Sequence, residues 1–188
     1  YLELPGFVQT LRTSQSGLSV KLAFEFLILT ACRTSEVLNA RWEEIDLEAK
    51  LWTIPAERMK MSKEHTVPLS PRAVEILQLA RQFNDADIVF PGRYAGHPLS
   101  NMALLVALRR MDREDLTAHG FRAAFKTWAS AETKYDSLVI EACLAHSVTG
   151  IERHYLRTDF PKLRRSLLER WAAFATAVPA QKIVRMAR

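Results

Sequence analysis

Apolar positions recur with helical spacing along most of the chain. Leu18, Leu22, Phe26 and Leu29 lie on one helical face and the residues between them are mostly apolar, so the segment 18–32 is predicted to be a buried helix. Thr34 or Ser35 is expected to cap a short helix that follows it. Further helices are predicted at 7–12, 71–83, 101–111, 119–131, 137–146 and 159–175, with Ser70, Ser100, Thr117 and Asp136 as caps.

Between residues 41 and 70 the apolar residues no longer follow helical spacing. Short runs rich in β-branched and aromatic residues occur at 45–47, 51–55 and 66–69, and residues 48–50 form a turn between the first two. Pro55 and Pro68 suit strand ends. We therefore expect a mainly α fold with a small three-stranded antiparallel β-sheet, and Lys60 near the tip of that sheet.

The length of 188 residues indicates one domain. We assign 1–17 to a linker and leading helix, 18–178 to the domain, and 179–188 to a C-terminal tail. The two cysteines, Cys32 and Cys143, make no disulfide framework, and no apolar run approaches the roughly 18 residues of a membrane span. A cytoplasmic protein without a membrane partner is expected. The first residue is Tyr rather than Met, which suits a piece of a longer protein.

Basic residues gather in three places. The net charge is +5 and the pI about 9.4, which is compatible with a nucleic-acid partner. Between residues 153 and 170 there are six basic and two acidic side chains. Other groups are Arg58, Lys60 and Lys63, and then Arg109, Arg110 and Arg113.

A set of polar residues scattered along the chain fits phosphoryl transfer. Tyr155 lies among arginines and histidines, and a phenol needs help to ionise near neutral pH. Two arginines can bind the non-bridging oxygens of a phosphodiester, and a lysine can protonate the leaving alkoxide. The candidates are Arg33, paired with Glu36, and Lys60, His119, Arg122, His146 and Tyr155.

The order of these residues resembles that of a known family. The chain is similar to the catalytic domain of tyrosine recombinases, the phage integrase family. The similarity rests on the Arg33 box, the segment around Lys60, the His-x-x-Arg box at 119–122, and His146 with Tyr155 nine positions later. The nearest resemblance is to integrases of satellite prophages and genomic islands, and it covers about residues 4–176. The matching segments are 29–37, 40–47, 52–61, 67–70, 117–122 and 140–146.

The resemblance implies a site-specific recombinase that cuts and rejoins DNA through a covalent 3′-phosphotyrosine, with no cofactor and no metal. Tyr155 would be the nucleophile, Arg33 and Arg122 would bind the scissile phosphate, and Lys60 would be the general acid. His119 would assist proton transfer, His146 would bind the phosphate, and Glu36 would support Arg33. The expected DNA contacts are Arg58, Lys63, Arg153 and Arg157.

The partner implied is a double-stranded DNA attachment site, bound as a tetramer in synapsis by a protein that is monomeric without DNA. The resemblance also implies a bacterial, nucleoid-associated location. The last helix would pack on its own domain or on a neighbouring subunit. Two alanines, Ala31 and Ala145, stand where the family often has glycine, which affects packing rather than chemistry. The N-terminal DNA-binding region of full-length members is missing, so the chain is expected to be a catalytic fragment.

Three other functions stay open at this point. A non-catalytic DNA-binding module would use the same scaffold without forming a covalent adduct. A type IB topoisomerase would share the chemistry but relax DNA without sequence preference. A zinc site could use Cys143 and His146, which have C-x-x-H spacing but no second pair to complete the ligand set.

Overall fold

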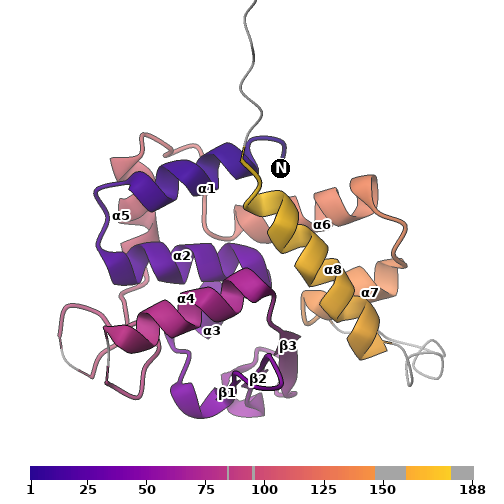
Figure 1. The fold of residues 1–188 in the computed structure, drawn as a ribbon, viewed down its shortest axis with the longest axis horizontal. Helices are drawn as coiled ribbons and strands as arrows, with labels where there is room; N and C mark the ends of the chain where they lie inside the picture. Colours follow the sequence, from indigo (N-terminus) through magenta and orange to yellow (C-terminus); the bar gives the residue numbers. More distant parts are fainter. Residues whose placement is uncertain (84, 95, 147–159, 179–188) are drawn as a thin grey trace, which may run out of the picture.

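The central helix of the fold is α2 (Leu18–Thr30), as the pattern predicts. The computed structural model describes residues 1–83, 85–94, 96–146 and 160–178. Every residue of α2 from Leu22 to Thr30 is buried, and the helix packs against α1, α3, α4, α5 and α8. Figure 1 shows α1 above it and α4 below it, with α6 and α7 at the far side of α8.

Among the described residues, the remaining helices follow the predicted order with shifted ends. They are α1 (Leu4–Thr13), α3 (Thr34–Leu38), α4 (Pro71–Gln82), α5 (Met102–Arg110), α6 (Gly120–Glu132), α7 (Ser137–Cys143) and α8 (Phe160–Ala175), with short 3-10 turns at Trp42–Glu44 and Ala56–Arg58. Two of the predicted caps form. The side chains of Ser70 and Asp136 accept hydrogen bonds from the backbone N–H groups of Ala73 and Leu138. Thr117 accepts one from the N–H of Gly120, but His119 is the residue that precedes α6, so Thr117 is not its cap.

Three other local predictions are wrong. Asn101, not Ser100, precedes α5, and its side chain makes no capping bond. Neither Thr34 nor Ser35 caps α3, because the helix starts at Thr34 and the Glu36 carboxylate binds the backbone N–H of Arg33. Helix α7 ends at Cys143 rather than His146, because Ala145 takes a left-handed conformation that turns the chain.

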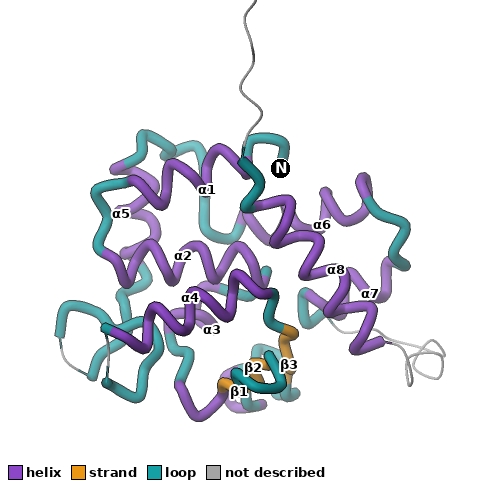
Figure 2. Tube along the Cα trace, in the orientation of Figure 1, coloured by secondary structure: helices purple, strands orange, loops and turns teal. Residues whose placement is uncertain are grey.

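The predicted three-stranded antiparallel sheet is confirmed. Its order is β1 (Ile45–Asp46), β2 (Leu51–Ile54), β3 (His65–Pro68). In its register Ile45 pairs with Trp52 and Ile54 with His65. Lys60 lies in the connection between β2 and β3, where it is exposed. The sheet lies at the lower edge of the molecule in Figure 2, and it packs against the 3-10 turn Trp42–Glu44 and against α8.

Helix α8 packs on its own domain. Leu167 and Trp171 are fully buried, while Leu163 stays 40% exposed. The Trp171 ring contacts Phe125, Trp128 and Phe174, and its indole N–H donates to the Ile28 carbonyl at 2.7 Å. The helix also packs against β3, so it connects the aromatic core with the sheet.

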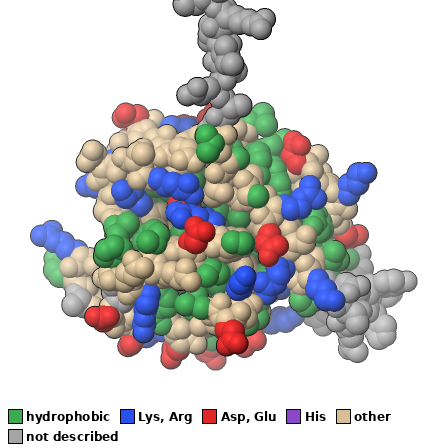
Figure 3. Space-filling model, viewed as in Figure 1, with side chains coloured by type: hydrophobic (Ala, Val, Ile, Leu, Met, Phe, Trp, Pro, Cys, Tyr) green, Lys and Arg blue, Asp and Glu red, His purple; other side chains and the backbone are tan. Residues whose placement is uncertain are grey.

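The surface in Figure 3 mixes charges. Lys and Arg side chains are interspersed with acidic and hydrophobic ones on this face rather than gathered into one patch. No helix among the described residues is long and apolar enough to cross a membrane.

Candidate anion-binding site at Arg33, Arg122 and His146

Arg33 lies at the junction between α2 and α3, held by a buried acid. The Glu36 carboxylate is 2% exposed and accepts hydrogen bonds from the Arg33 backbone N–H and from its Nη1, each at 2.7 Å. The predicted pair is therefore present. Within the described part of the chain, Nη1 is the one guanidinium nitrogen of Arg33 that makes a hydrogen bond, and the side chain is 23% exposed. The other donors remain available for an anion.

Arg122 approaches the same place from α6. It is 5% exposed, its Nη1 donates to the carbonyl of Ala31, and its Nη2 donates to that of Leu144 at 2.8 Å. Burial lowers the pKa of Arg122, and the positive charge of Arg33 lowers it further. The two guanidinium groups are thus within electrostatic range of each other, a repulsive arrangement that a bound anion would relieve.

Two strained turns supply the carbonyls that hold Arg122. Ala31 and Ala145 both have φ of 51°, a left-handed conformation that disfavours residues with a Cβ. Ala31 ends α2 and provides one carbonyl, while Ala145 follows Leu144, which provides the other. These are the two positions where the family often has glycine, so the departures noted in the sequence occur where the backbone would suit glycine best.

His146 completes this cluster. Its Nδ1 shares a short hydrogen bond with the Glu141 carboxylate, and its Nε2 lies 3.4 Å from Arg122 Nη2. Burial alone would raise the pKa of Glu141, but its hydrogen bonds with Lys126 and His146 outweigh this and lower it. Glu141 therefore stays ionised and orients the His146 ring with Nε2 toward Arg122.

The other candidates are placed more loosely. His119 is exposed just before α6, and its carbonyl accepts from the Arg122 N–H at 3.1 Å. Lys60 and Lys63 are exposed in the β2–β3 connection. Arg58 is bound inside the protein, by Glu44 at 3.0 Å and by the carbonyls of Glu36 and Asn39. Tyr155, Arg153 and Arg157 lie outside the described residues.

Sequence reasoning missed two residues behind this cluster. His65, at the start of β3, is 8% exposed, and its Nε2 has no hydrogen-bond partner in the described part of the chain. Arg164 on α8 donates from Nη2 to the Thr66 carbonyl at 2.6 Å. The signal for His65 was its inward register in the strand, two positions before Val67, but Arg164 looked like one member of a charge run.

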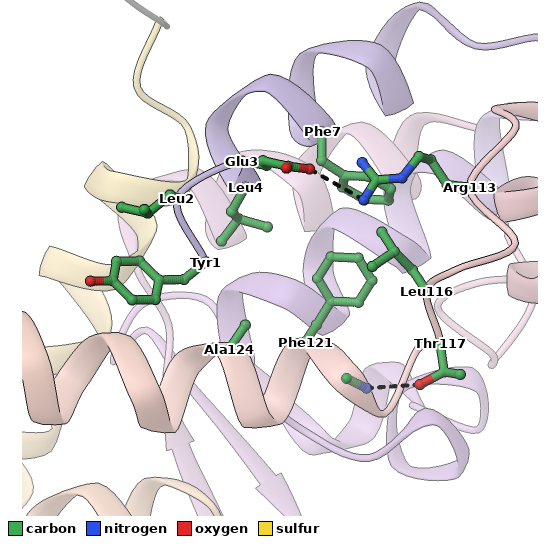
Figure 4. A pocket seen from close by; sticks show the side chains of 11 residues that line it. Tyr1, Leu2, Glu3, Leu4, Phe7, Arg113, Leu116, Thr117, Phe121 and Ala124 are labelled. Atoms are coloured by element: carbon green, nitrogen blue, oxygen red, sulfur yellow. Dashed lines mark hydrogen bonds and ion pairs between the residues drawn. The ribbon is translucent and has the colours of Figure 1, made fainter.

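One cavity, next to the N-terminal segment, lies apart from the cluster. About 430 Å³ opens between residues 1–7, the segment before α6 and α6 itself, where Glu3 pairs with Arg113 at 3.3 Å (Figure 4). None of the candidate residues lines it. In the described ranges no three His, Cys, Asp or Glu side chains gather as metal ligands would. The residues expected to bind a phosphate therefore lie in the arginine cluster and not in this cavity.

Comparison with known proteins agrees with the arrangement. The profile of the phage integrase family matches residues 2–161. Prophage integrase IntA of Escherichia coli (strain K12) is 36% identical over 186 residues, covering 97% of this chain and 45% of that protein. Prophage integrase IntZ of the same organism is 40% identical over 174 residues, covering 90% and 42%. The chain spans less than half the length of these curated relatives.

Solved structures share the fold. The integrase from mycobacterium phage Brujita has a TM-score of 0.66 at 22% identity, over 87% of this chain and 55% of that one. XerH site-specific recombinase bound to difH substrate has a TM-score of 0.62 at 21% identity, over 85% and 50%. A lambda integrase tetramer bound to a Holliday junction has a TM-score of 0.57 at 16% identity, over 84% and 47%. With a family profile that spans most of its length, the chain belongs to the phage integrase family.

Proposed function

We propose that this chain is the catalytic region of a site-specific DNA recombinase that cuts and rejoins DNA through a 3′-phosphotyrosine at Tyr155. The observation that carries the proposal is the pair of guanidinium groups, Arg33 from the α2–α3 junction and Arg122 from α6, beside the ring of His146. Their positions are fixed by Glu36 and by two backbone carbonyls. Preorganised donors of this kind stabilise the charge that develops on a phosphate in the transition state.

The proposed reaction is two transesterifications. The Tyr155 phenolate attacks the phosphorus, the P–O5′ bond breaks, and Lys60 gives a proton to the leaving 5′ oxygen. His119 assists removal of the phenol proton, and Arg33, Arg122 and His146 bind the non-bridging oxygens. A 5′-hydroxyl then attacks the phosphotyrosine, and the phenol leaves with a proton. No hydrolysis occurs, so the phosphodiester energy is kept.

Covalent capture tests this proposal. The DNA probe is a library of nicked duplexes with a randomised centre, in which cleavage releases a short fragment so that religation is prevented. Adducts that survive SDS are recovered and sequenced. We expect adducts with the wild type and with Tyr94→Phe, a control at a 71% exposed tyrosine, and none with Tyr155→Phe. A wild type without adducts would leave only a non-catalytic DNA-binding role.

A second test uses the DNA sequence recovered by covalent capture and addresses the arginine site. Arg122→Lys cannot bind both carbonyls and an anion with one planar group, so cleavage should fall by about a hundredfold or more. Arg109→Lys, at an exposed position in the last turn of α5, should leave the rate unchanged. Relaxation of plasmids that lack the recovered sequence, at a rate equal to that on plasmids carrying it, would favour a topoisomerase.

The proposed partner is duplex DNA, bound through Lys63, Arg153 and Arg157 in addition to the phosphate site. Arg58, which the sequence suggested as a further DNA contact, is instead bound to Glu44 and to the carbonyls of Glu36 and Asn39. Each phosphate contact removed should reduce the slope of log K against log salt by about 0.9, and Lys63→Ala tests one.

We further propose a monomer without DNA and a tetramer in synapsis, by analogy with the lambda integrase tetramer on a Holliday junction. Sedimentation with and without the captured DNA measures both states.

A further inference from the structure

His65 occupies an unusual place for a strand residue. It opens β3 with 8% of its surface exposed, and its Nε2 makes no hydrogen bond to any described residue. Arg164 of α8, Arg122 of α6 and Arg33 before α3 all lie within electrostatic range, and the backbone of Cys143 at the end of α7 contacts the ring. The imidazole therefore lies where four segments that build or flank the arginine site come together.

The surroundings keep this imidazole neutral. Burial is the main cause and the three guanidinium charges add to it, so the pKa of His65 falls from 6.5 to about 3, although the contact with the Cys143 backbone opposes this. A buried polar atom without a hydrogen-bond partner destabilises the folded state. Such groups are rare in folded proteins and call for an explanation.

Arg164 joins the same region from the other side. Its Nη2 donates to the carbonyl of Thr66, the residue after His65, at 2.6 Å, while its Nε is buried without a partner among the described residues. It also lies within range of Cys143. Arg164 thus connects α8, the helix that follows the segment carrying Tyr155, to the strand that follows Lys60.

The Lys60 segment is consequently held at both ends. Before it, Arg58 binds Glu44 and the carbonyl of Glu36, the acid that also binds Arg33. After it, His65 and the Thr66 carbonyl are packed against α7 and α8. Residues 60–64 between these ends are exposed, so the fixed ends decide where the lysine can reach.

We propose that His65 and Arg164 are positioning residues for proton delivery, which hold the β3 end of the Lys60 segment so that the lysine reaches the leaving 5′ oxygen. The inference rests on the proposed function. It assigns no contact between these two residues and the phosphate. Their loss should therefore affect only the step that needs the general acid, and leave phosphate binding by Arg33 and Arg122 intact.

A sulfur substitution in the DNA separates these effects. In a 5′-bridging phosphorothiolate the leaving group is a thiolate. A simple thiol has a pKa of about 8.5, far below the pKa of the alcohol that the oxygen ester releases. Its departure needs no proton. Single-turnover cleavage is measured on the captured suicide sequence with either oxygen or sulfur at the scissile 5′ position.

The variants are His65→Leu and Arg164→Met. We expect each to slow cleavage at least tenfold on the oxygen ester and less than threefold on the sulfur ester, the pattern expected of Lys60→Ala. Arg122→Lys should be slow on both. Arg165→Met is the matched control, because Arg165 is the next residue on α8 and binds the carbonyls of Ala49 and Lys50 in the β1–β2 turn; it should behave as wild type.

Equal losses on the two esters, or no loss on the oxygen ester, would overturn the inference. Thermal unfolding identifies a variant that has lost its fold, and the other variant then decides by the same oxygen-to-sulfur ratio. His65→Gln keeps a polar acceptor and should recover part of the oxygen-ester rate; its failure to do so counts against the inference. A wild type that forms no adduct, or a Lys60→Ala variant that sulfur does not rescue, would instead refute the proposed function itself.

Discussion

Replacing His65 by glutamine should make the protein less sensitive to acid. The pKa of His65 is lowered from 6.5 to about 3 by burial and by Arg164, Arg122 and Arg33, so the folded state favours the neutral ring. Above pH 6.5 His65 is neutral in both states and the free energy of unfolding has its full value. As the pH falls toward 3, the unfolded chain binds the proton first, and the free energy of unfolding falls.

The size of the effect follows from the two pKa values. Between pH 7 and pH 5 the unfolded histidine goes from about a quarter protonated to almost fully protonated, while the folded one gains almost no proton; one pKa unit corresponds to about 1.36 kcal/mol. Linkage then gives a loss of about 2 kcal/mol in the free energy of unfolding over this interval. Glutamine does not titrate, so His65→Gln avoids that loss while keeping a polar side chain of similar reach.

Urea unfolding at pH 7 and pH 5 measures this difference. The difference in free energy of unfolding between wild type and His65→Gln should change by about 2 kcal/mol in favour of the variant from pH 7 to pH 5. The other titrating groups are the same in both proteins, so their effects cancel in this difference. His97→Gln, at an exposed histidine in the 85–99 connection, should show no such shift. A His65→Gln difference that stays constant within about 0.5 kcal/mol would refute the assignment of a buried neutral imidazole.

Three further predictions concern stability and reactivity. Ala31 has φ of 51°, so Ala31→Gly should stabilise the protein by roughly 0.5–1 kcal/mol in thermal unfolding, which is the cost of a left-handed alanine less the entropy cost of glycine. In the same assay Ala123→Gly, on the exposed face of α6, should destabilise the protein by about 1 kcal/mol. Burial raises the pKa of Cys32 to about 12 and of Cys143 to about 11, so neither should react with a thiol reagent at pH 8 until the protein is denatured, and rapid native labelling would contradict this. Glu25→Ala should cost about 3 kcal/mol in denaturant unfolding, because it removes a 2% exposed carboxylate that binds Arg12 of α1 and Arg72 of α4. Arg72 keeps its ion pair with Glu75, and a loss below about 1 kcal/mol would show that the network contributes little.

The sequence by itself determined the elements and their order. Helices and strands follow from the spacing of apolar side chains, a local property that survives without knowledge of the partners. The ion pair of Arg33 with Glu36 was also predictable, because residues three apart at the start of a helix are neighbours whatever surrounds them. Caps formed by one side chain and a nearby N–H, as at Ser70 and Asp136, belong to the same class.

Only the tertiary structure decided how the functional groups are held. Arg122 is fixed by carbonyls that lie 91 and 22 residues away along the chain, and both carbonyls belong to turns whose left-handed alanines have no local sequence signal. His65 is neutral because packing buries it and places three arginines from separate elements around it, against the opposing contact with the Cys143 backbone. Burial and long-range electrostatics depend on which elements pack together, and the periodicity of one segment carries no information about the charge of another.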